Sequence, residues 1–165
     1  MAQKPQYRLK TLLGLREKEK TRTERVLGEC MAALKKEEDR LTEMEEELER
    51  MVARREAKRR EYAEKQMRGD MSAQAMVAGN VYIERMKELE DVQQDAINGQ
   101  KQVVTQREEE VEVARETLKV ATQELKALEK HREKWEKQIK REQQLKEEDE
   151  LDELAQTIFL SKNRK

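Results

Sequence analysis

Apolar residues recur at every seventh position over long stretches of both halves of the chain, and a second such row follows three residues behind the first. In the first half the two rows contain Leu13, Leu27, Leu34, Leu41 and Leu48, then Cys30, Met44 and Met51. In the second half they contain Ile83, Ile97, Val104, Val111, Leu118, Leu125 and Ile139, then Met86, Ala114, Ala121, Leu128 and Trp135. Alternating steps of three and four residues place these side chains in one narrow stripe along a helix, which is typical of a coiled-coil seam.

Polar residues interrupt both stripes at seam positions. The interruptions are Lys20, Glu37, Arg55 and Lys58 in the first half, and Glu90, Gln93, Gln100, Arg107 and Arg132 in the second. Between the halves the pattern stops at residues 67–72, where Gly69 is suited to end a helix and Asp70 or Ser72 to cap the next. Gly79 and Asn80 form a second weak point, which sets the outer limit of the expected turn.

These signals predict an all-α chain that forms one long antiparallel two-helix coiled-coil hairpin over residues 1–165. We expect helices over about 8–68 and 72–160, a turn at about 68–72 and a short basic tail at 161–165. Facing residues should then have numbers that sum to about 140, so that residues beyond about 132 lack a partner in the first helix. We expect the pair to be modestly stable and the unpaired end of the longer second helix to fray.

The composition agrees with long helices and excludes several classes of protein. Charged residues make up 44% of the chain, Gly and Pro number only 5 and 1, and five residues are aromatic (Trp 1, Tyr 3, Phe 1). This composition rules out a sandwich or barrel and leaves too little apolar side chain for an ordinary enzyme pocket. The net charge of −1 lacks the basic excess of a nucleic-acid binder. With one cysteine and neither a signal-peptide core nor a membrane span, we expect a cytoplasmic protein.

No group of residues predicts catalysis, a metal site or a cofactor site. A dyad could use only Cys30 and His131, which the expected pairing separates by about 20 residues, or ~30 Å. We therefore interpret them as a seam cysteine and a surface histidine. The basic run 54–60 lies beside the acidic block 37–49. It could contact nucleic acid or an acidic membrane surface, although a solvated face or an acidic protein partner fits the neighbouring charge better.

Three apolar groups are candidates for contacts with other proteins. Trp135 either packs near Tyr7 and Leu9 at the base of the hairpin or contacts a partner. An amphipathic stripe after the acidic run either binds a partner's groove or frays into solvent; it contains Leu151, Leu154, Ile158 and Phe159. Near the turn, a further group either forms an interface or closes the seam; it contains Tyr62, Tyr82, Ile83, Met86 and Leu89.

The segment Tyr7-Arg8-Leu9-Lys10-Thr11-Leu12-Leu13-Gly14-Leu15-Arg16-Glu17 resembles the start of the FliJ/YscO family of type III export stalk proteins in flagella and injectisomes. Four later segments agree in order and spacing. They are Asp70-Met71-Ser72-Ala73, Tyr82-Ile83, Leu125 to Leu128 followed by Glu129-Lys130, and Leu151-Asp152-Glu153-Leu154-Ala155. The resemblance covers most of the chain, and it fits flagellar and injectisome members alike, with a slight preference for the flagellar ones.

The resemblance implies an antiparallel coiled coil similar to the stalk (γ) subunit of rotary ATPases, at the cytosolic face of the inner-membrane export apparatus. Its termini would insert into the export ATPase hexamer and promote assembly and activity, through Arg8, Leu9, Leu12, Leu13, Leu15, Arg16, Leu151, Leu154 and Phe159. The cytosolic domain of the export gate protein would meet Tyr62, Tyr82, Met86 and Leu89, and some family members also bind export chaperones. The alternatives are a structural spacer or adaptor (escort) protein with no ATPase partner, and an RNA-associated helical protein.

Overall fold

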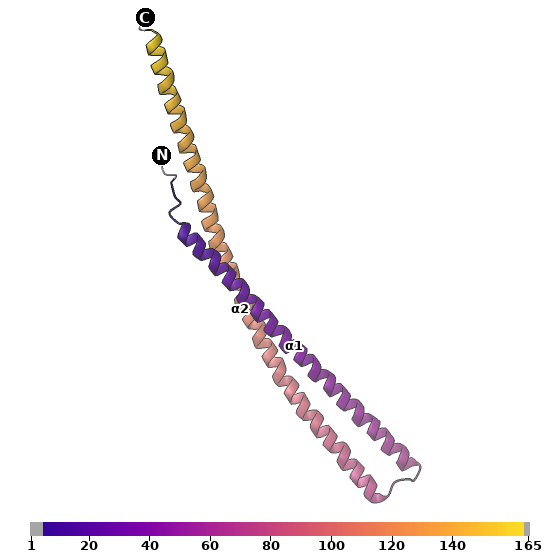
Figure 1. Ribbon diagram of the computed structural model, residues 1–165. Helices are drawn as coiled ribbons and strands as arrows, with labels where there is room; N and C mark the ends of the chain where they lie inside the picture. Colours follow the sequence, from indigo (N-terminus) through magenta and orange to yellow (C-terminus); the bar gives the residue numbers. More distant parts are fainter. Residues whose placement is uncertain (1–4, 164–165) are drawn as a thin grey trace. The chain divides into compact units, whose positions relative to one another are not determined.

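The computed structural model describes residues 5–163, which form two helices joined by a short turn (Figure 1). Helix α1 spans Lys10–Met67 and helix α2 spans Ala73–Lys162. The chain divides into two compact units, one formed by Met1–Arg25 with Glu116–Lys165 (unit 1) and the other by Val26–Arg115 (unit 2). Each unit contains part of both helices. The predicted all-α fold, an antiparallel pair of helices with the second one longer, is confirmed.

The turn is built from local backbone and side-chain hydrogen bonds. Gly69 adopts a φ of 72°, a left-handed conformation that glycine reaches without a Cβ clash, and it ends α1. The Asp70 N–H then donates to the Lys65 carbonyl at 3.0 Å. Of the two expected caps, Ser72 is used, because its Oγ accepts from the Ala75 N–H at 3.1 Å. Helix α2 continues through Gly79 and Asn80, so the turn ends well before residue 80.

The other helix ends differ from the expected ones by only a few residues. Helix α1 begins at Lys10 rather than near residue 8, and α2 continues to Lys162, into the segment expected to be a tail. The last two residues of that tail, 164 and 165, lie outside the described residues.

Within unit 2, α1 and α2 run antiparallel (Figure 1). Residues of the apolar rows form the core between them. Ile97, Val111 and Ala114 are buried, with 1%, 3% and 7% of their surface exposed. Gln93 of α2 donates through Nε2 to the Met44 carbonyl of α1 at 3.0 Å. This contact follows the predicted pairing, in which the numbers of facing residues sum to about 140.

The polar interruptions of the two rows meet one another across the seam of unit 2. Arg55 Nε donates to Glu90 Oε1 at 2.7 Å, with only 17% and 9% of the two side chains exposed. This hydrogen bond raises the pKa of the Arg55 guanidinium above its usual range. Gln100 Nε2 donates to Glu37 Oε2 at 2.7 Å and to the Glu37 carbonyl at 3.1 Å. Among the described residues no buried side-chain nitrogen or oxygen lacks a partner, so these polar layers oppose any slip in register.

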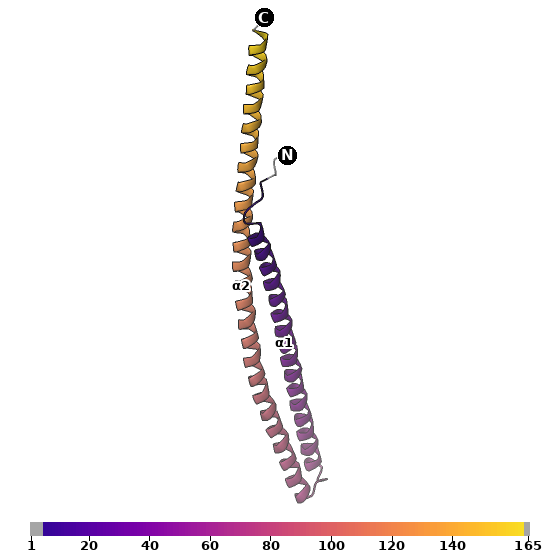
Figure 2. The same cartoon turned by 60° about the vertical axis from the view of Figure 1, so that its left-hand side comes forward.

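Unit 1 pairs the first turns of α1 with a later part of α2. Leu13, Ala121 and Leu125 are buried, and Arg16 pairs with Glu124 at 2.6 Å. The segment before α1 continues the contact (Figure 2). Tyr7 packs against Trp135 with ring centroids 5.3 Å apart, and its hydroxyl lies 2.7 Å from His131 Nδ1. The packing of Trp135 against Tyr7, which the sequence predicts at the base of the hairpin, is therefore confirmed.

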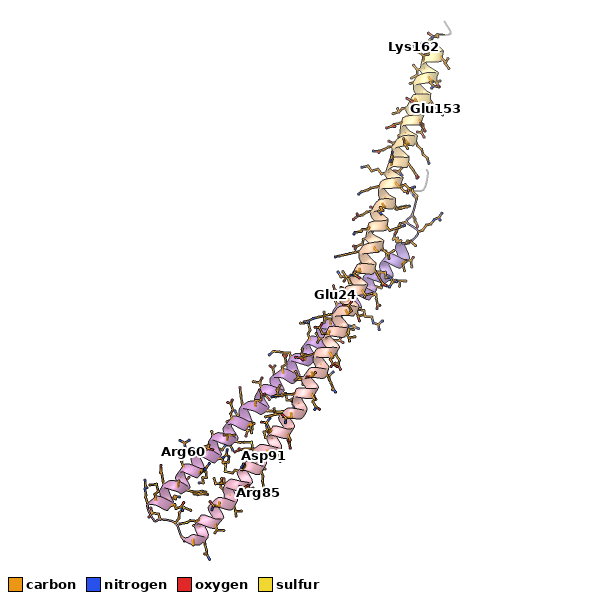
Figure 3. The ribbon with its side chains drawn as sticks, turned by 180° about the vertical axis from the view of Figure 1, so that it is seen from behind. Glu24, Arg60, Arg85, Asp91, Glu153 and Lys162 are labelled. Carbon is orange, nitrogen blue, oxygen red and sulfur yellow. The ribbon has the colours of Figure 1, made fainter. Side chains whose placement is uncertain are left out.

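Pro5 lines a shallow pocket with Ile139 and Gln143, and beyond it no described residue of unit 1 accompanies α2. All residues from 141 to 163 are exposed, and Figure 3 shows Glu153 and Lys162 on a stretch of helix that no other segment of the unit accompanies. The sequence expectation that the end of the second helix lacks a partner in the first agrees with this arrangement. Its charged sides and i,i+4 contacts, such as Gln138 to Glu142 at 3.0 Å, support the helix locally.

We predict that Glu90→Leu lowers the thermal midpoint by at least ~4 °C, because it leaves the Arg55 guanidinium without its partner in the seam. The double variant Arg55→Met/Glu90→Leu should regain most of that loss, since it removes both charges. Glu88→Leu, an exposed position on the same helix, is the matched control. Melting curves followed by circular dichroism measure the effect, and equal midpoints for Glu90→Leu and Glu88→Leu would contradict a stabilising polar layer.

Candidate protein-binding surfaces

A shallow groove in unit 1 contains three of the nine residues expected to meet the ATPase, and we call it the N-terminal groove. It is lined on α1 by Leu12, Leu15, Arg16, Glu19 and Thr23, and on α2 by Glu116, Thr117, Val120, Ala121 and Glu124. Leu12 and Leu15 are 38% and 58% exposed, so two leucines of α1 face outward rather than into the seam. The ion pair between Arg16 and Glu124 lies at the rim and fixes the groove's two walls relative to each other.

The remaining N-terminal candidates have different environments. Arg8 is exposed and Leu9 is half-buried. Leu13 is only 5% exposed because it belongs to the seam, as its place in the heptad row indicates. Leu13 therefore offers almost no surface to a partner while the two helices are paired.

The C-terminal stripe consists of Leu151, Leu154, Ile158 and Phe159 on the unaccompanied part of α2. These residues are 65%, 59%, 54% and 65% exposed. Leu151 follows Leu125 by about 26 residues, or ~39 Å of helix at ~1.5 Å per residue. The structure therefore does not merge this stripe with the N-terminal groove, and the ATPase-facing residues expected from the sequence form two separate surfaces.

Near the turn, unit 2 has a second groove, which we call the turn-proximal groove. It is lined by Met51 and Arg54 of α1 and by Tyr82, Arg85, Met86 and Leu89 of α2. Tyr82 and Leu89 are 48% and 50% exposed. Three of the four residues expected to face the export gate are thus brought together.

The fourth gate candidate, Tyr62, is half-buried in the seam. Its ring packs on α2 at Gly79, where a Cβ would lie 3.2 Å from two ring carbons. The Lys58 ammonium lies 5.5 Å from the ring centroid, an exposed cation–π contact. Tyr62 therefore closes the seam beside the turn, which was the alternative left open by the sequence, and Ile83 is half-buried as well.

Charged side chains surround this end of unit 2. Glu61 accepts hydrogen bonds at 3.0 Å from both Lys65 and Lys58, and these partners lower the pKa of the Glu61 carboxyl below 4.5. The same contact with Glu61 raises the pKa of Lys58. Since the folded carboxyl has the lower pKa, these pairs stabilise the fold above pH 4.5, and their contribution is lost as the pH falls further.

The sequence alone did not place Met51, Arg85 or Val120 on a surface, and it indicated Arg54 only as part of the basic run 54–60. Met51 was placed in the seam row. The available signal was the spacing of Tyr82, Arg85, Met86 and Leu89. Their successive steps of three, one and three residues place all four on one helical face. Contributions from the facing helix require knowledge of the register.

Cys30 and His131, the two residues considered for a dyad, have the environments that the sequence predicts. Cys30 is half-buried and His131 is exposed beside Tyr7, as expected. Residues 5–163 contain no group of three His, Cys, Asp or Glu side chains arranged as a metal site. No helix in the same range is both long and apolar enough to cross a membrane.

The fold and these surfaces define a class of protein, an antiparallel helical hairpin with exposed apolar grooves. The profile of the YscO-like protein family matches residues 4–165. The chain therefore belongs to the YscO-like family, which is associated with type III secretion and is not a known enzyme family. The FliJ/YscO resemblance seen in the sequence is confirmed.

A solved structure supports the same family. It is the candidate YscO homologue CT670 from Chlamydia trachomatis, which this chain resembles with a TM-score of 0.83 and 25% sequence identity. The match covers 98% of this chain and 99% of that one. None of the proteins with curated descriptions matches this chain by sequence.

We predict that the substitutions Gly99→Ala and Gly79→Ala, both within α2, change the free energy of unfolding by different amounts. Gly99 has open space around it, so its substitution should stabilise the helix by about 0.5–1 kcal/mol. Gly79→Ala should gain less or lose stability, because the new methyl group presses on the Tyr62 ring. Urea unfolding of both variants measures the difference. An equal gain at the two sites would show that Tyr62 does not pack on Gly79.

Proposed function

We propose that this chain is the central stalk component of a bacterial type III protein export apparatus. In this proposal, unit 1 inserts into the export ATPase hexamer and promotes its assembly and activity, and unit 2 links the ATPase to the cytosolic domain of the export gate protein. The protein would act in the cytoplasm, at the cytosolic face of the inner membrane, and would reach the membrane only through its partners. The observation that carries the proposal is the family match over residues 4–165.

The physical character of unit 1 supports a contact inside a ring of subunits. Two paired helices resist bending, because bending would disrupt the packed seam around Leu13, Ala121 and Leu125. The N-terminal groove lies on one side of the pair, whereas the C-terminal stripe lies on a single helix. If a partner buried Leu12 and Leu15, each side chain would stabilise the complex by about 1.5–3 kcal/mol. Surfaces that differ around the helices could contact different subunits in different ways.

The turn-proximal groove supports a second contact, in unit 2. Tyr and Met are enriched in interfaces, and the groove contains Tyr82, Met51 and Met86 beside two arginines. We assign the gate contact to Tyr82, Met86 and Leu89, with Tyr62 holding their helix in place from the seam. Export chaperones are further candidate partners, and the apparatus could be flagellar or of the injectisome type.

We predict that Leu12→Asp/Leu15→Asp abolishes stimulation of the cognate export ATPase, because it places two charges in the N-terminal groove. The loss of two buried leucines should weaken binding at least ~100-fold. ATP hydrolysis by the purified ATPase is measured with and without the chain, using the flagellar and the injectisome enzyme in turn. Leu13 is left intact, because its substitution would open the seam.

Val77→Asp/Val81→Asp is the matched control, since both valines are 64% exposed on α2 in unit 2. It should stimulate as the wild-type chain does, and both variants should keep the wild-type helical signal. If the wild-type chain stimulates neither ATPase, the result would favour a spacer or adaptor that has no ATPase partner. Full stimulation by the Leu12→Asp/Leu15→Asp chain would contradict the assignment of the groove.

A further inference from the structure

Two exposed apolar surfaces of this chain have opposite charge. The C-terminal stripe follows and overlaps an acidic run, Glu147 to Glu153, in which only Leu151 is uncharged. The turn-proximal groove has two arginines among its six lining residues and no acidic one. Figure 3 labels Arg85, which lines the groove in unit 2, and Glu153, which lies on the same helix as the stripe but outside it.

Two acidic residues of the C-terminal helix flank its apolar stripe, and Glu147 lies on the same face one turn before it. At about 100° per residue, Leu151, Leu154 and Ile158 lie on one face of the helix. On the same wheel Glu148 and Glu150 fall on opposite sides of that face, whereas Glu153 points away from it. All of these residues are exposed. The helix therefore presents an apolar ridge with a carboxylate on each side.

The turn-proximal groove has the complementary arrangement. Its apolar residues are Met51, Tyr82, Met86 and Leu89, and its arginines come from different walls, Arg54 from α1 and Arg85 from α2. From Tyr82 to Leu89 the groove extends for two helical turns, ~10.5 Å, which equals the length from Leu151 to Ile158. Arg54 is 65% exposed, and its contact with Glu47 is a long 3.3 Å, so it can turn toward a carboxylate of a partner.

We propose that the C-terminal helix of one copy of this chain docks in the turn-proximal groove of a second copy. Leu151, Leu154 and Ile158 fill the apolar floor, and Glu148 and Glu150 pair with the arginines of the two walls. The net charge of −1 means that whole chains do not repel each other, so that local charge decides the contact. The two surfaces are different, so the contact is heterologous and leaves one groove and one C-terminal helix free at the ends of each assembly.

This self-association uses surfaces that we assign to the ATPase and to the export gate. A chain engaged with another copy would therefore have part of both surfaces covered, and the partners would compete with it. The inference itself does not require the ATPase contact, because it concerns the purified chain alone. Self-association could be observed even if the chain did not stimulate the ATPase. Likewise, the chain could stimulate the ATPase without associating with itself.

Sedimentation equilibrium of the purified full chain tests the proposal. The weight-average mass of the wild-type chain should rise with concentration above the 19.7 kDa of one chain, and the rise should weaken as salt is added. Arg85→Glu and Glu150→Lys should each increase the dissociation constant at least ~10-fold. Glu153→Lys, on the far side of the same helix, should behave as the wild-type chain does. Circular dichroism confirms that each variant folds.

A mixing experiment separates this contact from other kinds of dimer. Arg85→Glu has no functional groove, and Leu154→Asp/Ile158→Asp has no functional stripe, so neither should associate alone. Their mixture has one intact groove and one intact stripe, and it should form a 1:1 pair of about twice the chain mass. A wild-type chain that stays monomeric at all concentrations, or an assembly that Arg85→Glu and Glu150→Lys leave unchanged, would overturn the proposal.

Discussion

The fold depends on a seam in which polar side chains of one helix meet polar side chains of the other. Arg55 meets Glu90 and Glu37 meets Gln100, whereas apolar residues such as Ile97 and Val111 fill the layers between. An apolar stripe alone would tolerate a shift by one heptad, because each layer resembles the next. The polar layers make such a shift costly, since it would leave Arg55 or Glu90 against apolar neighbours. They therefore set which residues of the two helices lie next to each other.

The binding surfaces follow from this register. Because the seam uses one side of each helix, leucines and methionines outside it are left exposed unless a partner covers them, as at Leu12, Leu15 and Leu89. The grooves form where such residues from both helices lie next to each other. In unit 1, Tyr7 packs against Trp135 just before α1 begins. The last part of α2 then continues without another described segment beside it. This chain of the YscO-like family therefore exposes several apolar surfaces, which we propose bind other proteins.

Much of this structure could be predicted from the sequence. The heptad rows identified Leu13, Ile97, Val111 and Leu125 as seam residues, and the turn signals located Gly69 and Ser72. The grooves could not be predicted in full, because each combines residues from two helices and depends on side-chain packing. The sequence grouped Tyr62 with Tyr82, yet Gly79 allows the Tyr62 ring to enter the seam. It also grouped Leu13 with Leu12, although the two point in different directions.

The register itself can be measured by pulsed electron paramagnetic resonance in unit 2. Spin labels would be placed at the exposed positions 38 and 101 in a Cys30→Ser background, diluted with unlabelled chain to remove contacts between copies. Paired helices lie about 8–10 Å apart, so the account predicts a short distance for 38 and 101. Labels at 38 and 87 should be ~20 Å farther apart along the helices. Equal distances for the two pairs, or a shorter one for 38 and 87, would contradict the account.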